Sequence, residues 1–313
     1  MNVNPAPTAP ITPAALTLRA PASTSNLGPG FDCLGLCLDL PLEVRVTPTE
    51  GAATTVVRRG EPVEVAPGED LLVRAFERGR ALLGAPPLAA RFEVHSSIPF
   101  GRGFGSSGAA VAAGLALGVR STGAEPGAHR AALVAAGCAL EGHPDNVVAA
   151  LYGGCTLGVP LADGSVRVLT LAVDAGIGLA LAWPAAPLPT PLARRALPAS
   201  VPFADAVENP RRLALLLRGL STGDPELLAL GVEDRLHERY RLPLIPGAPE
   251  ALAAARRAGA FAATISGAGS GLVALTVPER AAEVAAALAA PLGPGAIGRA
   301  AAVAHWGALE PCT

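Results

Sequence analysis

Short runs of alternating apolar and polar residues predict β-strands in the first hundred residues of the chain. Residues 16–19 alternate in this way, and an apolar-rich extended stretch follows over residues 34–46. The segment between them, residues 21–30, is rich in Gly, Pro, Ser and Asn and predicts a loop. A further strand is predicted over residues 91–98, where hydrophobic and charged side chains alternate.

Helical periodicity begins after Asp70, the predicted N-cap of a helix that Gly84 is predicted to end. A helix of small residues is predicted over residues 106–117. Later helices are predicted over residues 127–140, 144–151, 203–220, 250–257 and 279–288, and later strands over 155–159, 166–171, 178–183, 262–265, 272–277 and 298–304. This mixed order predicts an α+β fold with two domains and a boundary between residues 159 and 191. We expect the domains to span residues 1–160 and 161–313, with residues 1–15 as a loose tail.

Composition and charge exclude several classes of protein. The formal net charge is −2, from 24 basic and 26 acidic side chains, so there is no excess of positive charge for sequence-independent binding to nucleic acid. Half of the residues are hydrophobic, which excludes a disordered chain, and no apolar run is long enough to cross a membrane. The N-terminus lacks the features of a secretory signal, and the five cysteines are scattered, so we expect reduced thiols and a cytoplasmic location.

One glycine-rich segment between a predicted strand and a predicted helix indicates phosphate chemistry. Glycines let backbone amides approach an anion, and the start of a helix adds positive partial charge. Two serines at the helix start add hydroxyl groups that can cap the helix, reach a phosphate or bind a metal ion. The predicted phosphate loop consists of Pro99, Phe100, Gly101, Arg102, Gly103, Phe104, Gly105, Ser106, Ser107 and Gly108.

Taken alone, this loop leaves other interpretations open. Gly103, Gly105 and Gly108 satisfy the dinucleotide fingerprint G-x-G-x-x-G, but the next acidic residue, Glu125, lies in a loop instead of ending a second parallel strand. A Walker loop is excluded, because no Lys-Ser or Lys-Thr follows the last glycine. A flexible turn before a tightly packed helix also fits the pattern.

Two more polar loops that contain glycine favour a nucleotide site assembled from distant segments. Residues 23–32 read Ser-Thr-Ser-Asn-Leu-Gly-Pro-Gly-Phe-Asp, and residues 266–271 read Ser-Gly-Ala-Gly-Ser-Gly. The three loops resemble the three signature motifs of the GHMP small-molecule kinases. Within them, residues 22–32 and the Glu-Gly-His-Pro-Asp-Asn-Val segment at 141–147 resemble the homoserine kinase branch.

This resemblance implies a fold and an activity. The implied fold has an N-terminal domain like ribosomal protein S5 domain 2 and a ferredoxin-like C-terminal domain, in a protein that is usually a homodimer. The implied reaction transfers the γ-phosphate of ATP to the side-chain hydroxyl of L-homoserine, a step towards threonine. No nucleic acid and no membrane is expected as a partner.

The resemblance also implies roles for individual residues. The phosphate loop would bind ATP, and Ser107 and Glu141 would hold Mg²⁺. Asp32 would bind the ammonium group of the substrate, and two arginines would bind its carboxylate, since a guanidinium matches a carboxylate bidentately. The expected substrate-binding residues are Asn26, Asp32, His143, Asn146, Arg194 and Arg241, with Arg235 as a weaker candidate beside Arg241. No general base is assigned, and we expect transition-state electrostatics from Ser107, Glu141 and Arg194.

The sequence departs from the family pattern at several positions. Phe104 replaces a leucine of the phosphate loop, Ser270 and Gly271 replace Pro-Thr, Arg239 replaces a proline, and Leu71 stands where the family often has asparagine near the adenine. Three alternatives to homoserine phosphorylation stay open at this point. One is a GHMP kinase for another alcohol, such as mevalonate or a sugar, and the second is a non-catalytic nucleotide-binding relative. The third is the dinucleotide-dependent oxidoreductase that Gly103, Gly105 and Gly108 allow.

Overall fold

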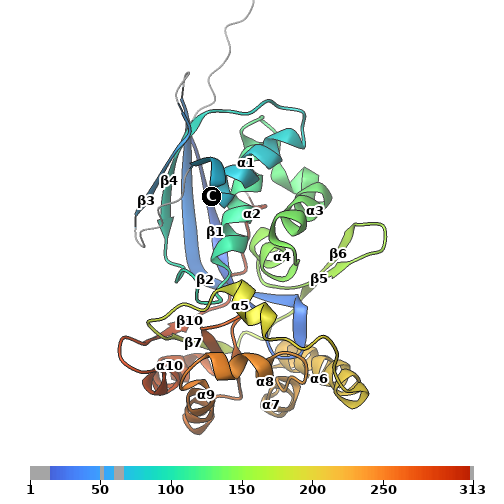
Figure 1. Cartoon of the computed structure of the whole chain (residues 1–313), viewed down its shortest axis with the longest axis vertical. Helices are drawn as coiled ribbons and strands as arrows, with labels where there is room; N and C mark the ends of the chain where they lie inside the picture. Colours follow the sequence, from blue (N-terminus) through green and yellow to red (C-terminus); the bar gives the residue numbers. More distant parts are fainter. Residues whose placement is uncertain (1–14, 50–52, 60–66, 311–313) are drawn as a thin grey trace, which may run out of the picture.

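The computed structural model describes residues 15–49, 53–59 and 67–310, and it stacks two domains along the long axis of the molecule (Figure 1). Most of the expected N-terminal tail lies outside the described residues. Among the four cysteines described, none is in a disulfide, and Cys312 lies outside the described part. No helix in the described ranges is long and apolar enough to span a membrane.

The first domain is built on a mixed sheet in the order β3-β4-β2-β5-β6, with β1 pairing alongside β2. All pairings within the described sheet are antiparallel except that of β3 with β4. The strands are β1 (Leu16–Asn26), β2 (Gly30–Pro48), β3 (Thr55–Arg59), β4 (Ala90–Ser96), β5 (Cys155–Pro160) and β6 (Val166–Leu171).

Long strands β1 and β2 form the hairpin that carries the first polar loop. The predicted loop over residues 21–30 is mostly strand, and only residues 27–29 form the turn. The serines of this segment are buried although they are polar, and they bond to residues from distant segments. A local sequence pattern cannot show such partners, so the pattern predicts a loop where the structure has a strand. Strand β3 was not predicted either, because its five-residue sequence, Thr-Val-Val-Arg-Arg, does not alternate between apolar and polar residues.

Helices cover one face of the first sheet (Figure 1). They are α1 (Leu71–Ala81), α2 (Ser106–Arg120), α3 (Arg130–Glu141) and α4 (Asp145–Tyr152), with short 3-10 turns at Pro67–Glu69 and Pro126–His129. Asp70 caps α1 as predicted, because its Oδ1 accepts the amide of Leu72 at 2.9 Å. Glycines let α1 and α2 approach closely: a Cβ on Gly118 would lie 2.2 Å from the Phe76 carbonyl oxygen.

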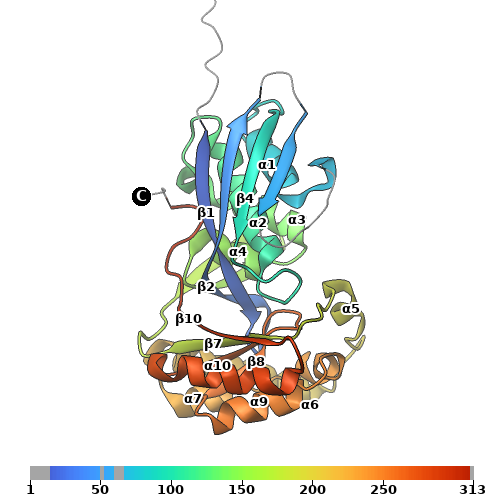
Figure 2. The same cartoon turned by 90° about the vertical axis from the view of Figure 1, so that its left-hand side faces the viewer.

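The second domain is an antiparallel sheet in the order β10-β7-β9-β8, with most of its helices on the face away from the first domain and α5 at the junction (Figure 2). With helices between β7 and β8 and between β9 and β10, this is the ferredoxin-like arrangement, so the predicted α+β fold with a ferredoxin-like C-terminal domain is confirmed. Its strands are β7 (Gly178–Trp183), β8 (Ala262–Ile265), β9 (Leu272–Thr276) and β10 (Ile297–Ala301). Its helices are α5 (Thr190–Arg195), α6 (Phe203–Thr222), α7 (Pro225–Gly231), α8 (Glu238–Arg241), α9 (Ala248–Arg257) and α10 (Ala281–Ala289), with 3-10 turns at Leu242–Leu244, Pro278–Arg280 and Ala290–Leu292.

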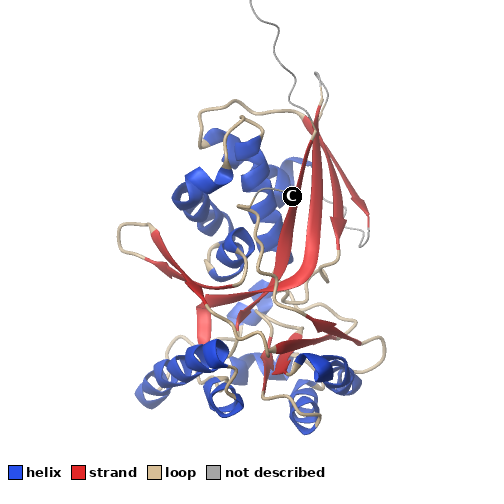
Figure 3. Ribbon diagram, turned by 180° about the vertical axis from the view of Figure 1, so that it is seen from behind, coloured by secondary structure: helices blue, strands red, loops and turns tan. Residues whose placement is uncertain are grey.

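The chain crosses between the domains more than once, as the view from behind shows (Figure 3). Strand β6 pairs with β5 in the first sheet, so that sheet extends to residue 171, beyond the boundary expected at residue 160. After β10 the chain returns to the first domain, where Val303 bridges Leu38 and the amide of Ala308 donates to the Ala150 carbonyl at 2.9 Å. The turn of the β1–β2 hairpin extends from the first domain to the second, and its Leu27 is buried with only 1% of its surface exposed.

The contact between α1 and α2 gives a stability prediction. Gly118→Ala gains helix propensity of about 1 kcal/mol but places a methyl group against the backbone of α1. We expect the net free energy of unfolding to fall by about 2 kcal/mol, as in overpacked cores. Urea unfolding followed by circular dichroism measures this change. The control is Gly68→Ala, where an added Cβ would have no atom within 4 Å, and it should stay within about 0.5 kcal/mol of the unaltered protein. Equal stability of both variants would contradict the prediction.

Candidate active site

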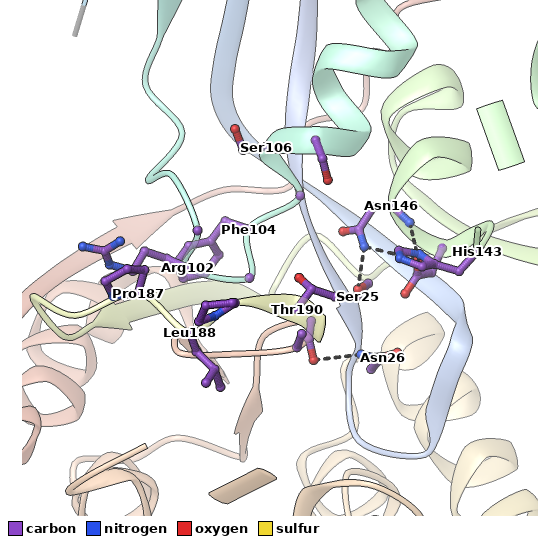
Figure 4. Close-up of a pocket in the computed structure, with 18 of the residues that line it drawn as sticks. Ser25, Asn26, Arg102, Phe104, Ser106, His143, Asn146, Pro187, Leu188 and Thr190 are labelled. Atoms are coloured by element: carbon purple, nitrogen blue, oxygen red, sulfur yellow. Dashed lines mark hydrogen bonds and ion pairs between the residues drawn. The ribbon is translucent and has the colours of Figure 1, made fainter. Parts of the chain in front are cut away.

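A cleft of about 490 Å³ lies where the three polar loops meet at the junction of the domains (Figure 4). Its walls come from the β1–β2 hairpin, the phosphate loop, the segment before α4, the connection from β7 to α5, and the third loop. Every residue that the sequence predicts for the site, except Gly108 and the weaker candidate Arg235, lines this cleft. Gly108 packs against Asn146, since a Cβ there would lie 2.8 Å from the Asn146 Cβ, and Arg235 is exposed outside the cleft.

Backbone conformation shapes the phosphate loop for an anion. Gly105 is the N-cap of α2 in the left-handed region, and among the described residues no side chain caps the amides of the helix start. A Cβ on Gly103 would lie 2.1 Å from the carbonyl oxygen of Ser266, so this residue has to be glycine. The loop therefore presents the uncapped amides of a 15-residue helix to the cleft, which is a favourable arrangement for phosphate oxygens.

Ser107 and Glu141 form a pair of oxygen donors beside these amides. The Ser107 hydroxyl donates to Glu141 Oε2 at 3.0 Å, bringing together the first turn of α2 and the last residue of α3. Burial raises the pKa of Glu141, while the hydrogen bond from Ser107 opposes that shift. Among the described residues, no group of three or more His, Cys, Asp or Glu side chains is arranged to hold a metal ion by itself.

His143 and Asp145 form a second charged pair at the edge of the cleft. Their Nδ1 and Oδ1 atoms lie 2.6 Å apart, and Asp145 is buried. The hydrogen bond to Asp145 raises the pKa of His143 above its ordinary value of 6.5. Burial favours a higher pKa for Asp145, but the hydrogen bond and charge of His143 outweigh burial and hold this pKa below 3.8.

The two asparagines join the loops to one another. Asn146 Nδ2 donates to Ser25 Oγ at 3.0 Å, and its Oδ1 accepts the hydroxyl of Ser23 at 2.9 Å. Asn26 Nδ2 donates to the Gly267 carbonyl at 2.8 Å, and its Oδ1 accepts the amide of Asp32 at 2.9 Å. Figure 4 shows Ser25, Asn146 and His143 together on one side of the cleft. The amide groups of both asparagines are thus engaged within the protein.

Asp32 and Arg194 face each other across the cleft although 162 residues separate them in the sequence. Arg194 Nη1 and Nη2 donate to the two carboxylate oxygens of Asp32 at 3.0 and 2.7 Å. This bond raises the pKa of Arg194. Both side chains keep about a third of their surface exposed, so the pair is accessible from the cleft.

Arg241 is a second cation of the cleft and is almost completely buried, with 1% of its surface exposed. Its guanidinium lies 5.1 Å from the ring centre of Phe31 and donates to the Gly267 carbonyl at 3.2 Å. Within the described part of the chain, its Nε has no hydrogen-bond partner. Burial lowers the pKa of Arg241. A buried guanidinium with an unsatisfied N–H group beside a cleft is a suitable receptor for a ligand carboxylate.

Comparison with known proteins agrees with the motifs. The family model of the GHMP kinases N terminal domain matches residues 70–154, and that of GHMP kinases C terminal matches residues 214–293. Homoserine kinase of Thermus thermophilus is 42% identical over 277 residues, covering 88% of this chain and 92% of that protein. The chain belongs to the homoserine kinase family of GHMP kinases.

Further relatives support this family. Homoserine kinase of Gloeobacter violaceus is 43% identical over 280 residues, which are 88% of this chain and 92% of that protein. The crystal structure of homoserine kinase from Cytophaga hutchinsonii has a TM-score of 0.83 at 26% identity and covers 97% of this chain and 99% of its own. L. major mevalonate kinase in complex with R-mevalonate has a TM-score of 0.69 at 13% identity, covering 94% and 97% of the chains, a likeness of fold alone.

Two residues that contact the loops around the cleft, His237 and Glu238, were not predicted from the sequence. His237 Nε2 lies 2.9 Å from the Gly28 carbonyl and stacks on Phe31 with ring centres 5.2 Å apart. Glu238 is partly buried, accepts the hydroxyl of Thr264 and accepts the amide of Ile265 at 3.0 Å. Burial raises the pKa of Glu238 to about 7. Both residues lie in the same segment as Arg241, residues 234–241. Their position in this motif was the only sequence signal that could have marked them as part of the site.

The His143–Asp145 pair predicts a titration that can be measured. In Asp145→Asn, the raised pKa of His143 should fall towards or below 6.5, because the carboxylate is lost and burial remains. NMR titration of the imidazole signals measures this pKa, with the exposed His305 as the internal control. An unchanged His143 titration would contradict the pairing.

The same pair also sets a direction for stability. Its contribution is complete between the ordinary pKa values of 3.8 and 6.5. It is lost as pH rises through the raised pKa of His143 and as pH falls through the lowered pKa of Asp145. In Asp145→Asn the stability of the protein should therefore depend less on pH in both of these windows.

Proposed function

We propose that this protein is a homoserine kinase, which transfers the γ-phosphoryl group of ATP to the side-chain hydroxyl of L-homoserine. One observation carries the proposal: the cleft places an anion, Asp32, against two cations, Arg194 and Arg241, beside a loop built for phosphates. A zwitterionic amino acid needs this set of opposite charges, and a phosphoryl donor needs the loop. The alternatives of a different alcohol or of nucleotide binding alone lack such support from the relatives.

ATP has two adjoining spaces to fill. Its phosphates fit over the amides of Gly103 to Ser107, at the start of α2. A second cavity of about 320 Å³ lies on the other side of this loop and shares Ser106, Ser107 and Phe100 with the cleft. Its remaining wall is mainly apolar and includes Leu71, so an adenine ring fits there without the asparagine that the family often has.

Mg²⁺ fits the oxygen donors next to the phosphates. Ser107 and Glu141 offer a hydroxyl and a carboxylate at hydrogen-bond distance from each other, and both are hard donors of the kind that Mg²⁺ prefers. Phosphate oxygens and water would complete the coordination, since these two residues are too few to hold the ion alone. When bound, the ion neutralises charge that develops on the transferred phosphoryl group.

The substrate fits between the charged groups of the cleft. Asp32 would bind the ammonium group, and Arg194 and the unsatisfied Nε of Arg241 would bind the carboxylate. Asn146 and His143 lie on the same side of the cleft and would place the hydroxyl end. Because Arg194 bonds Asp32 in this structure, each charged group of the substrate would replace one partner of an existing ion pair. The desolvation cost of binding is thereby reduced.

Catalysis in this site rests on alignment and charge neutralisation. Phosphoryl transfer has a loose transition state that spreads negative charge over the equatorial oxygens, and the protein gains most by holding the reactants in line. The oxygen of the homoserine hydroxyl bonds to the γ-phosphorus, the bond to ADP breaks, and the hydroxyl proton leaves late to phosphate or water. Ser107, Glu141 and Arg194 supply the electrostatics. Consistent with the family, we also expect a cytoplasmic homodimer.

The function is tested by coupled ADP release with L-homoserine against L-serine, L-threonine and mevalonate. Homoserine at millimolar concentration should accelerate ADP release far more than the other alcohols. Acceleration by mevalonate instead would favour the other-alcohol alternative, and tight ATP binding with no acceptor-dependent turnover would favour a non-catalytic relative.

Arg241→Lys tests the carboxylate site. Lysine keeps the charge but loses the planar fork, so the KM for homoserine should rise at least about tenfold while the KM for ATP changes little. The control is Arg239→Lys, which changes a nearby exposed arginine that pairs with Asp205 outside the cleft. Equal homoserine KM values in the two variants would refute the role of Arg241.

Glu141→Gln tests the metal site. Loss of the carboxylate charge should raise the Mg²⁺ concentration for half-maximal turnover at least about tenfold. Glu125→Gln, at an exposed loop position, is the matched control. If both variants need the same Mg²⁺ concentration, Glu141 does not hold the ion.

A further inference from the structure

Arg102 lies in the phosphate loop, yet its side chain does not point at the place for the phosphates. Figure 4 shows it directed away from Ser25, Asn146 and His143, on the side of Pro187. Its guanidinium is engaged by carbonyl oxygens of the backbone, so its donors are directed away from a ligand. A role other than direct phosphate binding is therefore needed.

The guanidinium joins the two domains. Its Nε donates to the Pro184 carbonyl at 3.1 Å and its Nη2 to the Ala185 carbonyl at 2.5 Å, both in the connection that follows β7 in the second domain. Its Nη1 donates to the Phe100 carbonyl at 2.7 Å, within the phosphate loop itself. One planar group thus fixes the position of this connection relative to the loop, and only a guanidinium has donors in the required directions.

Neighbouring contacts extend this attachment along the same connection, residues 184–189. The amide of Leu188 donates to the Gly101 carbonyl at 3.3 Å. From the other side, the Ser270 hydroxyl donates to the Ala186 carbonyl at 2.9 Å. The connection is therefore held between the phosphate loop and the third loop.

This connection leads directly into the substrate side of the cleft. Pro189 is the N-cap of α5, and α5 carries Arg194, whose guanidinium bonds Asp32. Continuous contacts therefore run from the phosphate loop through Arg102 and residues 184–189 to the arginine expected at the homoserine carboxylate. A displacement of the phosphate loop would therefore move Arg194, and the reverse, because the connection between them is short and rich in proline.

We propose that Arg102 is a positioning residue that couples the binding of ATP to the binding of homoserine. The inference rests on the proposed function and extends it. When phosphates order the loop, Arg102 fixes the connection, and α5 then holds Arg194 in place for the carboxylate. Because coupling of binding is reciprocal, homoserine improves ATP binding by the same factor.

Arg102→Met tests the coupling, since it keeps most of the stem and removes all donors. The dissociation constant of homoserine is measured by calorimetry with and without a non-hydrolysable ATP analogue and Mg²⁺. In the unaltered protein the analogue should tighten homoserine binding at least about fivefold, and in Arg102→Met this factor should fall close to one. Arg91→Met is the matched control, because Arg91 pairs with Glu93 on the exposed face of β4 and should keep the factor.

Two results would overturn the role of Arg102. The first is an unchanged coupling factor in Arg102→Met. The second is weaker binding of the ATP analogue with the coupling factor intact, which would make Arg102 a direct phosphate ligand. No binding of homoserine by the unaltered protein would instead overturn the proposed function, so the two failures are distinguishable.

Hydrogen exchange of the ligand-free proteins gives a readout independent of activity. Arg102→Met should exchange faster over residues 184–195, while α2 keeps its protection. Ser270→Ala, which releases the same connection from the other side without changing the phosphate loop, should also speed exchange there and lower the coupling factor. Unchanged exchange over residues 184–195 in Arg102→Met would contradict the attachment, and loss of protection throughout α2 would indicate general destabilisation and equally overturn a specific positioning role.

Discussion

The active site depends on close approach of backbone to backbone across the domain junction. A Cβ on Gly103 would lie 2.1 Å from the carbonyl oxygen of Ser266, and one on Gly28 would lie 2.0 Å from that of Val232. The amide of Gly271 donates to the Arg102 carbonyl at 2.9 Å in the same region. No side chain can be inserted at these points, so the phosphate loop packs directly against the backbone of the second domain. The proposed ATP site and the proposed substrate site therefore meet at one interface.

Two departures from the family pattern belong together in this interface. Phe104, in place of leucine, is buried and meets Trp183 edge to face with ring centres 5.5 Å apart. A Cβ at Gly271 would lie 2.3 Å from the Arg102 carbonyl oxygen and 2.7 Å from the Phe104 ring, so the threonine common in the family would clash with both. The larger side chain in one loop is accommodated by the smallest residue in the other. In the sequence these changes stand 167 positions apart and look independent.

The sequence could predict the fold and which residues line the cleft, but not how these residues are paired. Periodicity and the order of elements indicate α+β, and the motifs identify the loops because glycine and serine patterns are local. The bond between Asp32 and Arg194 joins residues 162 positions apart and leaves no local pattern. Ser23 and Ser25 look like loop residues because their partner, Asn146, lies far along the chain. The direction of the Arg102 side chain is likewise set by the second domain.

The cations of this protein add a further constraint. All 24 basic residues of the chain are arginines, and lysine is absent. The planar guanidinium of arginine is suited to planar acceptors. In and beside the cleft, Arg194 donates two hydrogen bonds to the Asp32 carboxylate, and Arg102 donates to three backbone carbonyls. A triphosphate, in contrast, is often bound by a lysine, whose ammonium group acts as a flexible point charge. Because the chain has no lysine, the proposed binding of the phosphates rests on the amides of the phosphate loop and on the expected metal ion. Amides contribute only when their directions are fixed, and here the seating of the second domain against the glycines fixes them.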